Sequence, residues 1–219
     1  MLELINYTKL YPNGKVGAKD INLKVENGDI FAFIGHNGAG KTTTIKSIVG
    51  INDITSGDIL IDDISIKENP LLCKQKIAYV PDNPDIYTAL TGIQYINLVA
   101  DFFKVSKEAR ERLTTKYATE LELISDLNNP ISTYSHGMRQ KLVLISAFVH
   151  SPKLLVLDEP TNTLDEDGQE FLKKLVLEQK ALGKTLLISS HDKTFIEDVA
   201  DGIYYVSEGR IRKNEKIAE

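Results

Sequence analysis

The stretch that decides the fold of this chain is Phe31-Ala32-Phe33-Ile34-Gly35-His36-Asn37-Gly38-Ala39-Gly40-Lys41-Thr42-Thr43. Its opening residues are apolar and predict a buried strand, which the glycines then end. The segment from Lys41 to Ile48 has the pattern of a helix. Strand, glycine loop and helix in this order form the context in which Gly-x-x-x-x-Gly-Lys-Thr binds phosphate groups.

This spacing suits a triphosphate, because many backbone N–H groups can converge on its oxygens where no side chain blocks the approach. Gly35, Gly38 and Gly40 allow the backbone to curl at the positive end of the following helix. Lys41 would add a positive charge near the β- and γ-phosphates, and the Thr42 hydroxyl would ligate Mg²⁺. The stretch therefore predicts a P-loop that binds a magnesium nucleoside triphosphate.

The composition indicates one soluble globular domain, or one domain with two lobes, since 42% of the 219 residues are hydrophobic and 26% are charged. We find no apolar stretch of about 18 residues that could span a bilayer, and no secretory signal. A single cysteine, Cys73, excludes an internal disulfide and fits a reducing cytoplasm. The net charge of −5 argues against nucleic acid as a partner.

The order of patterns along the chain indicates a helical insertion between strands. Alternating segments at 2–11 and 16–25 predict an antiparallel hairpin, and short apolar runs predict later strands. From Thr91 to about Val149 the periodicity is helical, and it begins with a capping box formed by Thr91 and Gln94. We expect helices at about 107–124, from 135 onward, at 167–181 and at 193–200, and strands at 59–61, 77–80, 154–157, 185–188 and 202–206. Strands that alternate with helices predict a mostly parallel sheet covered on both faces.

Two acidic residues follow the apolar run Leu154 to Leu157. Parallel sheets bind ligands at the carboxyl ends of their strands, so Asp158 would hold Mg²⁺ through water and Glu159 would orient or deprotonate the attacking water. An acidic turn without function is the alternative. His191 follows the next strand, where it would donate to a γ-phosphate or would simply be a polar residue at a strand end.

The segment Tyr134-Ser135-His136-Gly137-Met138-Arg139-Gln140-Lys141 opens a further helix. Ser135 is a suitable N-cap, and the positive end of this helix would again face an anion. By itself the segment is also compatible with an ordinary capped helix.

The complete order of motifs resembles the ATP-binding subunits of ABC transporters over essentially the whole chain. The motifs are the P-loop, the helical insertion, the Ser-x-Gly segment, Asp158-Glu159-Pro160, the stretch 161–165 and the strand before His191. The resemblance implies a P-loop α/β core with a mostly parallel sheet, an N-terminal antiparallel β subdomain and an inserted helical subdomain. It implies one domain over 1–219, with a core at 1–81 and 151–219 and a helical subdomain at 82–150.

The resemblance also implies ATP and Mg²⁺ as ligands and a role for each matching residue. Tyr11 would stack on adenine, Ser135 to Met138 would bind the γ-phosphate held by a partner subunit, and Asp165 would lie at the interface of a head-to-tail dimer. The implied catalytic residues are Lys41, Glu159 and His191, and the implied metal ligands are Thr42, Asp158 and Asp82. The residues implied to contact nucleotide are Tyr11, Gly35, His36, Asn37, Gly38, Ala39, Gly40, Lys41, Thr42, Thr43, Ser135, His136, Gly137, Met138 and Asp165.

The sequence departs from the family pattern in two places. Asp82 stands where the family usually has a glutamine near Mg²⁺. In the helix-opening segment, Tyr134, His136 and Met138 replace the commonest Leu, Gly and Gln, whereas Ser and Gly are kept at 135 and 137. This style of segment resembles simple bacterial exporters whose permease is a separate chain.

The sequence thus predicts an ATPase subunit that pairs with a second copy or a homologous subunit and binds an integral membrane permease at the cytoplasmic side of the membrane. Ile86, Tyr87 and Leu90 would present an apolar patch to the permease, or would pack beneath their own loop. Alternatives are a soluble ABC-type ATPase with a non-transport partner, a P-loop kinase, or a nucleotide sensor without turnover. The chain lacks the tandem domain or coiled coil of the first, and its Ser-x-Gly segment argues against the second. The intact Lys41 and Glu159 argue against the third.

Overall fold

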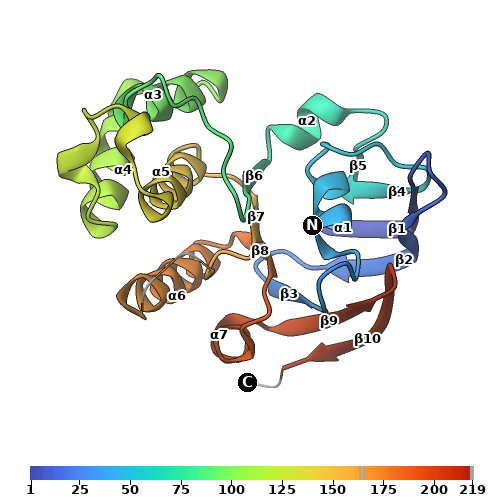
Figure 1. Cartoon of the computed structure of the whole chain (residues 1–219). Coiled ribbons are helices and arrows are strands. Elements are labelled where there is room, and N and C mark those ends of the chain that lie inside the picture. The colour runs from blue at the N-terminus through green and yellow to red at the C-terminus, as the bar shows by residue number, and fades with distance from the viewer. Residues whose placement is uncertain (163, 165, 218–219) are drawn as a thin grey trace.

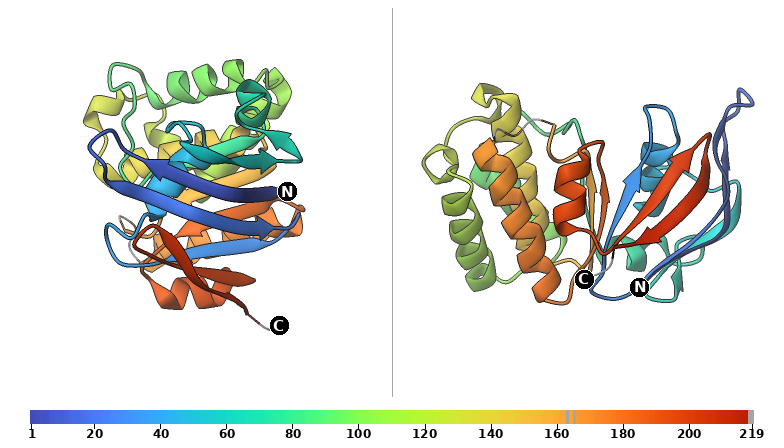
Figure 2. Two further views of the ribbon diagram at one scale, coloured as in Figure 1. Left: turned by 90° about the vertical axis from the view of Figure 1, so that its right-hand side faces the viewer. Right: turned by 90° about the horizontal axis from the view of Figure 1, so that it is seen from below.

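The computed structural model describes residues 1–162, 164 and 166–217. These residues form three layers: a group of helices, a central sheet and a second sheet on the far side (Figures 1 and 2). Within the described part of the chain, no helix is long and apolar enough to cross a lipid bilayer.

The central sheet has the strand order β10-β9-β3-β8-β7-β6, and neighbouring strands run parallel except at the pair β9 and β10. The predicted mostly parallel sheet is therefore confirmed. Strands β7 and β8 are buried along their whole length because helices cover one face of the sheet and α1 and the second sheet cover the other. The bounds are β3 (Ile30–Ile34), β6 (Ile77–Val80), β7 (Leu154–Asp158), β8 (Thr185–Ser189), β9 (Gly202–Ser207) and β10 (Arg210–Lys216).

The second sheet is antiparallel and includes the predicted hairpin, whose strands β1 and β2 pair from Leu2 with Val25 to Leu10 with Val16. Helix α1 (Lys41–Ile48) lies between the two sheets, where Ile45 and Ile48 are fully buried. The glycine loop before α1 consequently sits where both sheets meet. The bounds are β1 (Leu2–Leu10), β2 (Val16–Val25), β4 (Ser56–Ile61) and β5 (Ile64–Ser65).

The helical insertion shares one hydrophobic core with the central sheet, and Ile96, Tyr117 and Phe148 of the insertion contribute to it. The predicted capping box is confirmed at its start: the Gln94 N–H donates to the Thr91 hydroxyl, and the Thr91 N–H donates to the Gln94 side chain. The helices of the chain other than α1 are α2 (Pro70–Lys74), α3 (Gly92–Phe102), α4 (Lys107–Glu120), α5 (His136–Val149), α6 (Glu166–Ala181) and α7 (Lys193–Val199), with short 3₁₀ turns at Ile124–Asp126 and Ile131–Thr133.

Some predicted boundaries were wrong. The helix expected at 107–124 ends at Glu120, because the chain turns at Glu122 with a φ of 55°. Strand β10 was missed, since it is mostly exposed and rich in charged residues and so lacks an apolar strand pattern. Helix α2 was missed because it is only 5 residues long.

The three members of the predicted apolar patch between residues 82 and 91 differ in burial. Ile86 and Leu90 are partly buried against the core shared by the helical insertion and the central sheet, whereas Tyr87 is 68% exposed. The partial burial of Ile86 and Leu90 agrees with the alternative, packing beneath their own loop.

His150 gives the folded state a dependence on pH. Its ring stacks on Phe103 with 3.7 Å between the ring centroids, and burial lowers the pKa of His150 from 6.5 to about 4. As the pH falls from 6.5 toward 4, the unfolded chain gains a proton that the folded chain does not bind, so the free energy of unfolding decreases in this window. Above it, His150 contributes no dependence on pH.

We therefore expect a His150→Phe variant to lose less stability than the parent chain between pH 6.5 and about pH 4. The difference in the loss is at most about 3 kcal/mol, from the size of the pKa shift. Urea unfolding of both chains across this window measures it. Parallel stability curves for the two chains would contradict this assignment.

Candidate active site

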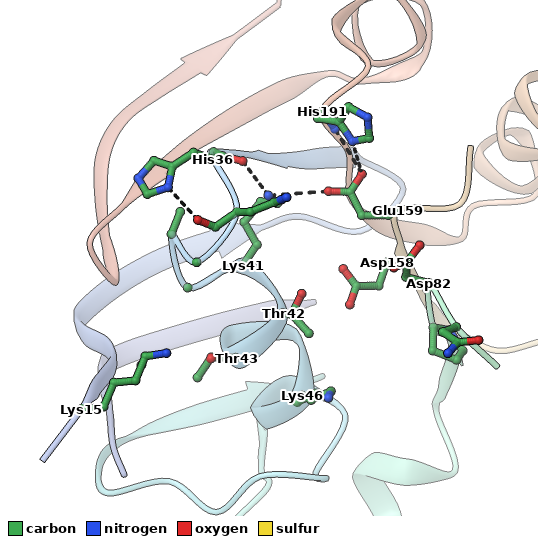
Figure 3. Close-up of a pocket in the computed structure, with 18 of the residues that line it drawn as sticks. Lys15, His36, Lys41, Thr42, Thr43, Lys46, Asp82, Asp158, Glu159 and His191 are labelled. Atoms are coloured by element: carbon green, nitrogen blue, oxygen red, sulfur yellow. Dashed lines mark hydrogen bonds and ion pairs between the residues drawn. The ribbon is translucent and has the colours of Figure 1, made fainter. Parts of the chain in front are cut away.

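A cleft of about 880 Å³ opens where the glycine loop, the hairpin and the carboxyl ends of the central strands meet (Figure 3). Its volume is in the range of sites for small organic ligands. The cleft is lined by Tyr11, Asn13, Lys15, Val16, Gly17, the loop residues 35–43, Lys46, Tyr79, Pro81, Asp82, Asn83, Asp158, Glu159, Asn162 and His191.

Two glycines of the loop are required by close backbone contacts. A Cβ atom on Gly35 would lie 2.3 Å from the Val206 carbonyl oxygen, and one on Gly40 would lie 2.6 Å from the Gly17 carbonyl oxygen. Gly40 also has a φ of 109° and is the N-cap of α1, without a side chain to cap the helix. The free N–H groups at the start of α1 therefore form a positive, anion-binding end.

The Lys41 side chain is only 6% exposed and is held by its own loop. Its Nζ donates to the Gly35 carbonyl oxygen at 2.6 Å and lies 3.6 Å from Oε1 of Glu159. At the other end of the cleft, the hydroxyls of Tyr11 and Thr43 lie 3.2 Å apart. The loop thus presents a buried positive charge beside its free N–H groups.

Asp158 lies at the end of β7, is buried, and accepts a hydrogen bond from the Ser189 hydroxyl. Burial raises the pKa of Asp158; hydrogen bonds from Ser189 and Thr42 lower it, and the nearby carboxylates of Glu159 and Asp82 raise it further. Figure 3 shows the three carboxylates on one side of the cleft, with Lys41 and Thr42 facing them. This arrangement concentrates negative charge where a cation would be stabilised.

Glu159 has a φ of 50°, and its backbone N–H donates to the Ser189 carbonyl oxygen at 3.0 Å. Its Oε2 accepts from the backbone N–H of His191 at 3.2 Å and lies 2.9 Å from Nδ1 of the same residue. The Glu159 carboxylate is consequently fixed between His191 and Lys41 (Figure 3).

The structure brings most of the predicted site residues together but separates one group. Tyr11, the loop 35–43, Asp82, Asp158, Glu159 and His191 all line the cleft. The residues Ser135 to Met138 do not: Ser135 caps α5, its Oγ accepting from the Met138 N–H at 3.2 Å, and His136 is exposed. Asp165 lies outside the described residues.

Sequence reasoning missed other residues of the cleft. Lys15 reaches it only because the hairpin folds over the glycine loop, and Tyr79 reaches it from a strand that was predicted only as buried. Asn162 donates to Oδ1 of Asp82 at 2.9 Å across a separation of 80 residues. Only Asn162 carried a sequence signal, since it lies in the stretch 161–165 that follows the two acids.

This fold and cleft define a nucleotide-binding α/β protein with a P-loop. A family model described as ABC transporter matches residues 18–162, which is more than half of the chain, and the chain therefore belongs to this family. It is an ATPase subunit of the kind found in ABC transporters, and ATP is the nucleotide that it binds and hydrolyses.

Two curated bacterial relatives illustrate the similarity. The lantibiotic transport ATP-binding protein SrtF of Streptococcus pyogenes is 33% identical over 211 residues, which cover 96% of this chain and 89% of SrtF. The SkfA peptide export ATP-binding protein SkfE of Bacillus subtilis is 30% identical over 219 residues, covering 98% of this chain and 88% of SkfE.

A solved structure extends the comparison to an assembly. The ATP-binding cassette MJ0796, determined as a dimer in a post-hydrolysis state with ADP and Pi, matches with a TM-score of 0.88. The two chains are 26% identical, and the match covers 100% of each.

Gly35 provides a test of the loop geometry. In a Gly35→Ala variant the new Cβ would lie 2.3 Å from the Val206 carbonyl oxygen, so the loop must shift away from β9. We expect a loss of ATP affinity of roughly 10-fold or more, because the backbone N–H groups of the loop bind phosphate oxygens only when they point at the same place. Equilibrium binding of a fluorescent ATP analogue measures it.

A Gly183→Ala variant is the control, because Gly183 has a φ of 75° with open space around it and does not line the cleft. It should cost about 1 kcal/mol of stability without changing ATP affinity. Equal ATP affinity in the Gly35 variant and the parent chain would contradict the proposed loop constraint.

Proposed function

We propose that this chain binds MgATP in the cleft, hydrolyses it in a head-to-tail dimer, and drives export through a separate membrane permease from the cytoplasmic face of the membrane. The single observation that carries the proposal is that Ser135 to Met138 lie outside the cleft and begin a helix whose Ser135 and His136 are exposed. One chain would then hold half of a site, and the N-terminus of α5 from a second chain would supply the other half.

The dimer is supported by the MJ0796 cassette, which was determined as a dimer. In the proposed assembly, Ser135, Gly137 and the α5 N-terminus face the γ-phosphate held by the partner. Asp165 is proposed for the same interface. Either a second copy of this chain or a homologous ATPase subunit would complete the pair.

Within each half site we propose that Tyr11 stacks on adenine, held by its contact with Thr43. The backbone of residues 35–43, including His36, Asn37 and Ala39, would surround the phosphates. Lys41 would exchange its bond to the Gly35 carbonyl for the β- and γ-phosphates, which neutralises part of their charge.

Mg²⁺ fits the donor set of the cleft. The hydroxyl of Thr42 and the carboxylates of Asp158 and Asp82 are oxygen ligands of the kind that Mg²⁺ prefers. Burial, and to a lesser extent the nearby carboxylates of Glu159 and Asp82, raise the pKa of Asp158. Among the described residues, no group of three or more His, Cys, Asp or Glu side chains could hold a metal by itself. We therefore propose binding together with phosphate oxygens; the ion would supply charge neutralisation of the triphosphate.

Glu159 is proposed to orient the attacking water and to accept its proton. Its position beside the Lys41 ammonium and the His191 N–H groups supports this role, because both hold the carboxylate at the edge of the phosphate site. His191 would keep Glu159 oriented and donate to the γ-phosphate.

A Glu159→Gln variant tests the assignment. The amide is nearly isosteric but cannot accept the proton, so we expect a loss of ATP hydrolysis of roughly 100-fold or more with ATP binding retained. The bound ATP should then persist and stabilise the dimer. Phosphate release measures turnover, and size-exclusion chromatography with and without ATP measures the dimer.

The matched control is Glu170→Gln, which removes an exposed carboxylate on α6 away from the cleft and should leave hydrolysis unchanged. Turnover near the parent rate in the Glu159 variant would refute its role as base.

Exposed apolar side chains support a permease partner. Leu71 on α2 is 72% exposed, Tyr87 is 68% exposed and Phe102 on α3 is 78% exposed. Helices α2 and α3 both lie along the upper side of Figure 1, with residues 81–91 between them. We propose that this side faces the membrane, and the names of SrtF and SkfE support transport of peptides.

We also propose that residues 82–150 form a subdomain distinct from the core at 1–81 and 151–219. Its helices are consecutive in sequence, pack on the central sheet through a shared hydrophobic core, and connect to that sheet through residues 81–91 and 150–153. Two connections at neighbouring strands β6 and β7 would allow it to rotate as a unit.

Tyr87 tests the docking surface. A Tyr87→Cys change in a Cys73→Ser chain, labelled with a photoreactive group, should cross-link to an integral membrane protein in native membranes. Lys213→Cys on β10 is the control, because the Lys213 side chain is 62% exposed and β10 lies on the lower side of Figure 1, away from α2 and α3. Equal labelling of membrane proteins from both positions would argue against docking at Tyr87.

A further inference from the structure

The three carboxylates of the cleft share one arrangement. Asp158 accepts from the Ser189 hydroxyl on Oδ1, and Glu159 accepts from His191 on Oε2. Asp82 accepts from Nδ2 of Asn162 on Oδ1 at 2.9 Å. In each case one oxygen accepts from a donor in another segment. The second oxygen of Asp158 accepts from the Tyr79 hydroxyl at 3.5 Å, and the second oxygen of Glu159 lies 3.6 Å from Nζ of Lys41.

Asn162 joins two segments that are far apart in sequence. Asp82 follows β6 and Pro81, where the chain leaves the central sheet for the helical insertion, and Asn162 lies in the turn after Glu159. Both residues line the cleft. Among the described residues, Oδ2 of Asp82 has no hydrogen-bond partner, so it is free to accept a ligand.

The position of Asp82 is constrained from a second side. Gln140 on α5 is 1% exposed, and its Nε2 donates to the Pro81 carbonyl oxygen at 3.1 Å. Pro81 restricts the backbone immediately before Asp82. The backbone at this junction is thus held by α5 and the side chain by Asn162.

We propose that Asn162 is a positioning residue that orients Asp82 toward the Mg²⁺ of the bound nucleotide. The inference rests on the proposed function and extends it to a residue with no assigned role. A carboxylate is shorter than the glutamine that is usual at position 82, and a single free Asp side chain could rotate away. The Asn162 amide removes that freedom and leaves Oδ2 available to a ligand.

Loss of Asn162 should therefore weaken the binding of Mg²⁺ and leave the binding of ATP itself unchanged. In an Asn162→Ala variant the charge of Asp82 remains but its direction is lost, and partners that orient metal ligands typically change metal affinity by 10-fold or more. ATP binding without Mg²⁺ depends on the glycine loop and should stay the same. In a chain that already carries Asp82→Ala, the additional change Asn162→Ala should have no further effect on Mg²⁺ affinity.

The test uses the full chain with Glu159→Gln, which binds without turnover. Mg²⁺ is titrated against a fluorescent ATP analogue in chains with Asn162→Ala, Asp82→Ala, or both, and binding is also measured in EDTA. We expect a roughly 10-fold higher half-saturating Mg²⁺ for each single variant, no further shift in the double variant, and unchanged binding in EDTA. Asn214→Ala on β10 is the control and should show no shift.

Additive shifts in the double variant would overturn the inference, because Asn162 would then act independently of Asp82. An equal loss of binding in EDTA would also overturn it, since that indicates damage to the loop. If the Glu159→Gln chain binds no MgATP at all, the proposed function fails, and the inference fails with it. Asn162→Ser, which keeps a donor, should recover part of the Mg²⁺ affinity.

Discussion

Backbone contacts fix the glycine loop against β9 and against the turn before β10, and the charged groups of the cleft depend on this placement. The Val206 carbonyl lies where a side chain on Gly35 would stand, and the Gly209 N–H donates to the Ala39 carbonyl oxygen at 2.7 Å. Contacts between backbone atoms cannot relax by a change of rotamer. The direction in which Lys41 and α1 leave the loop is therefore set by β9 and by the turn before β10.

The electrostatics of the cleft follow from this constraint. Lys41 stands opposite the carboxylates of Glu159, Asp158 and Asp82, and burial makes both signs of charge costly to leave unpaired. In the described structure Lys41 is paired with its own loop and with Glu159. In the proposed mechanism a triphosphate takes over these contacts, so substrate binding itself would release Glu159 from the lysine.

The sequence predicted the parts of this protein whose signals are local. The glycine loop, the two acids at the end of β7 and the capping box at Thr91 each depend on neighbouring residues, and the structure contains all three elements. The contacts that could not be predicted join segments that are far apart in the sequence. Asn162 meets Asp82 only because the turn after β7 passes the end of β6, and Lys15 enters the cleft only because of the hairpin.

Differences in burial account for the other points at which the sequence did not predict the structure. Ile86 and Leu90 are apolar residues in a loop, a pattern that fits an exposed surface and a packed one equally well. Strand β10 is the opposite case: it pairs with β9 at the edge of the sheet, but its many charged residues do not give the apolar pattern of a strand. In both cases the outcome depends on which neighbours the completed fold supplies.

The exposed position of Ser135 and His136 has a consequence for how this subunit depends on its surroundings. If two half sites must meet, the rate of ATP hydrolysis by free subunits would rise with the square of their concentration. Dilute subunits would therefore hydrolyse very little ATP. A permease that holds two subunits side by side replaces this encounter by an intramolecular closure, with an effective concentration that reaches the millimolar range. ATP hydrolysis would then be confined to assembled transporters, and no separate inhibitor of the free subunit would be needed.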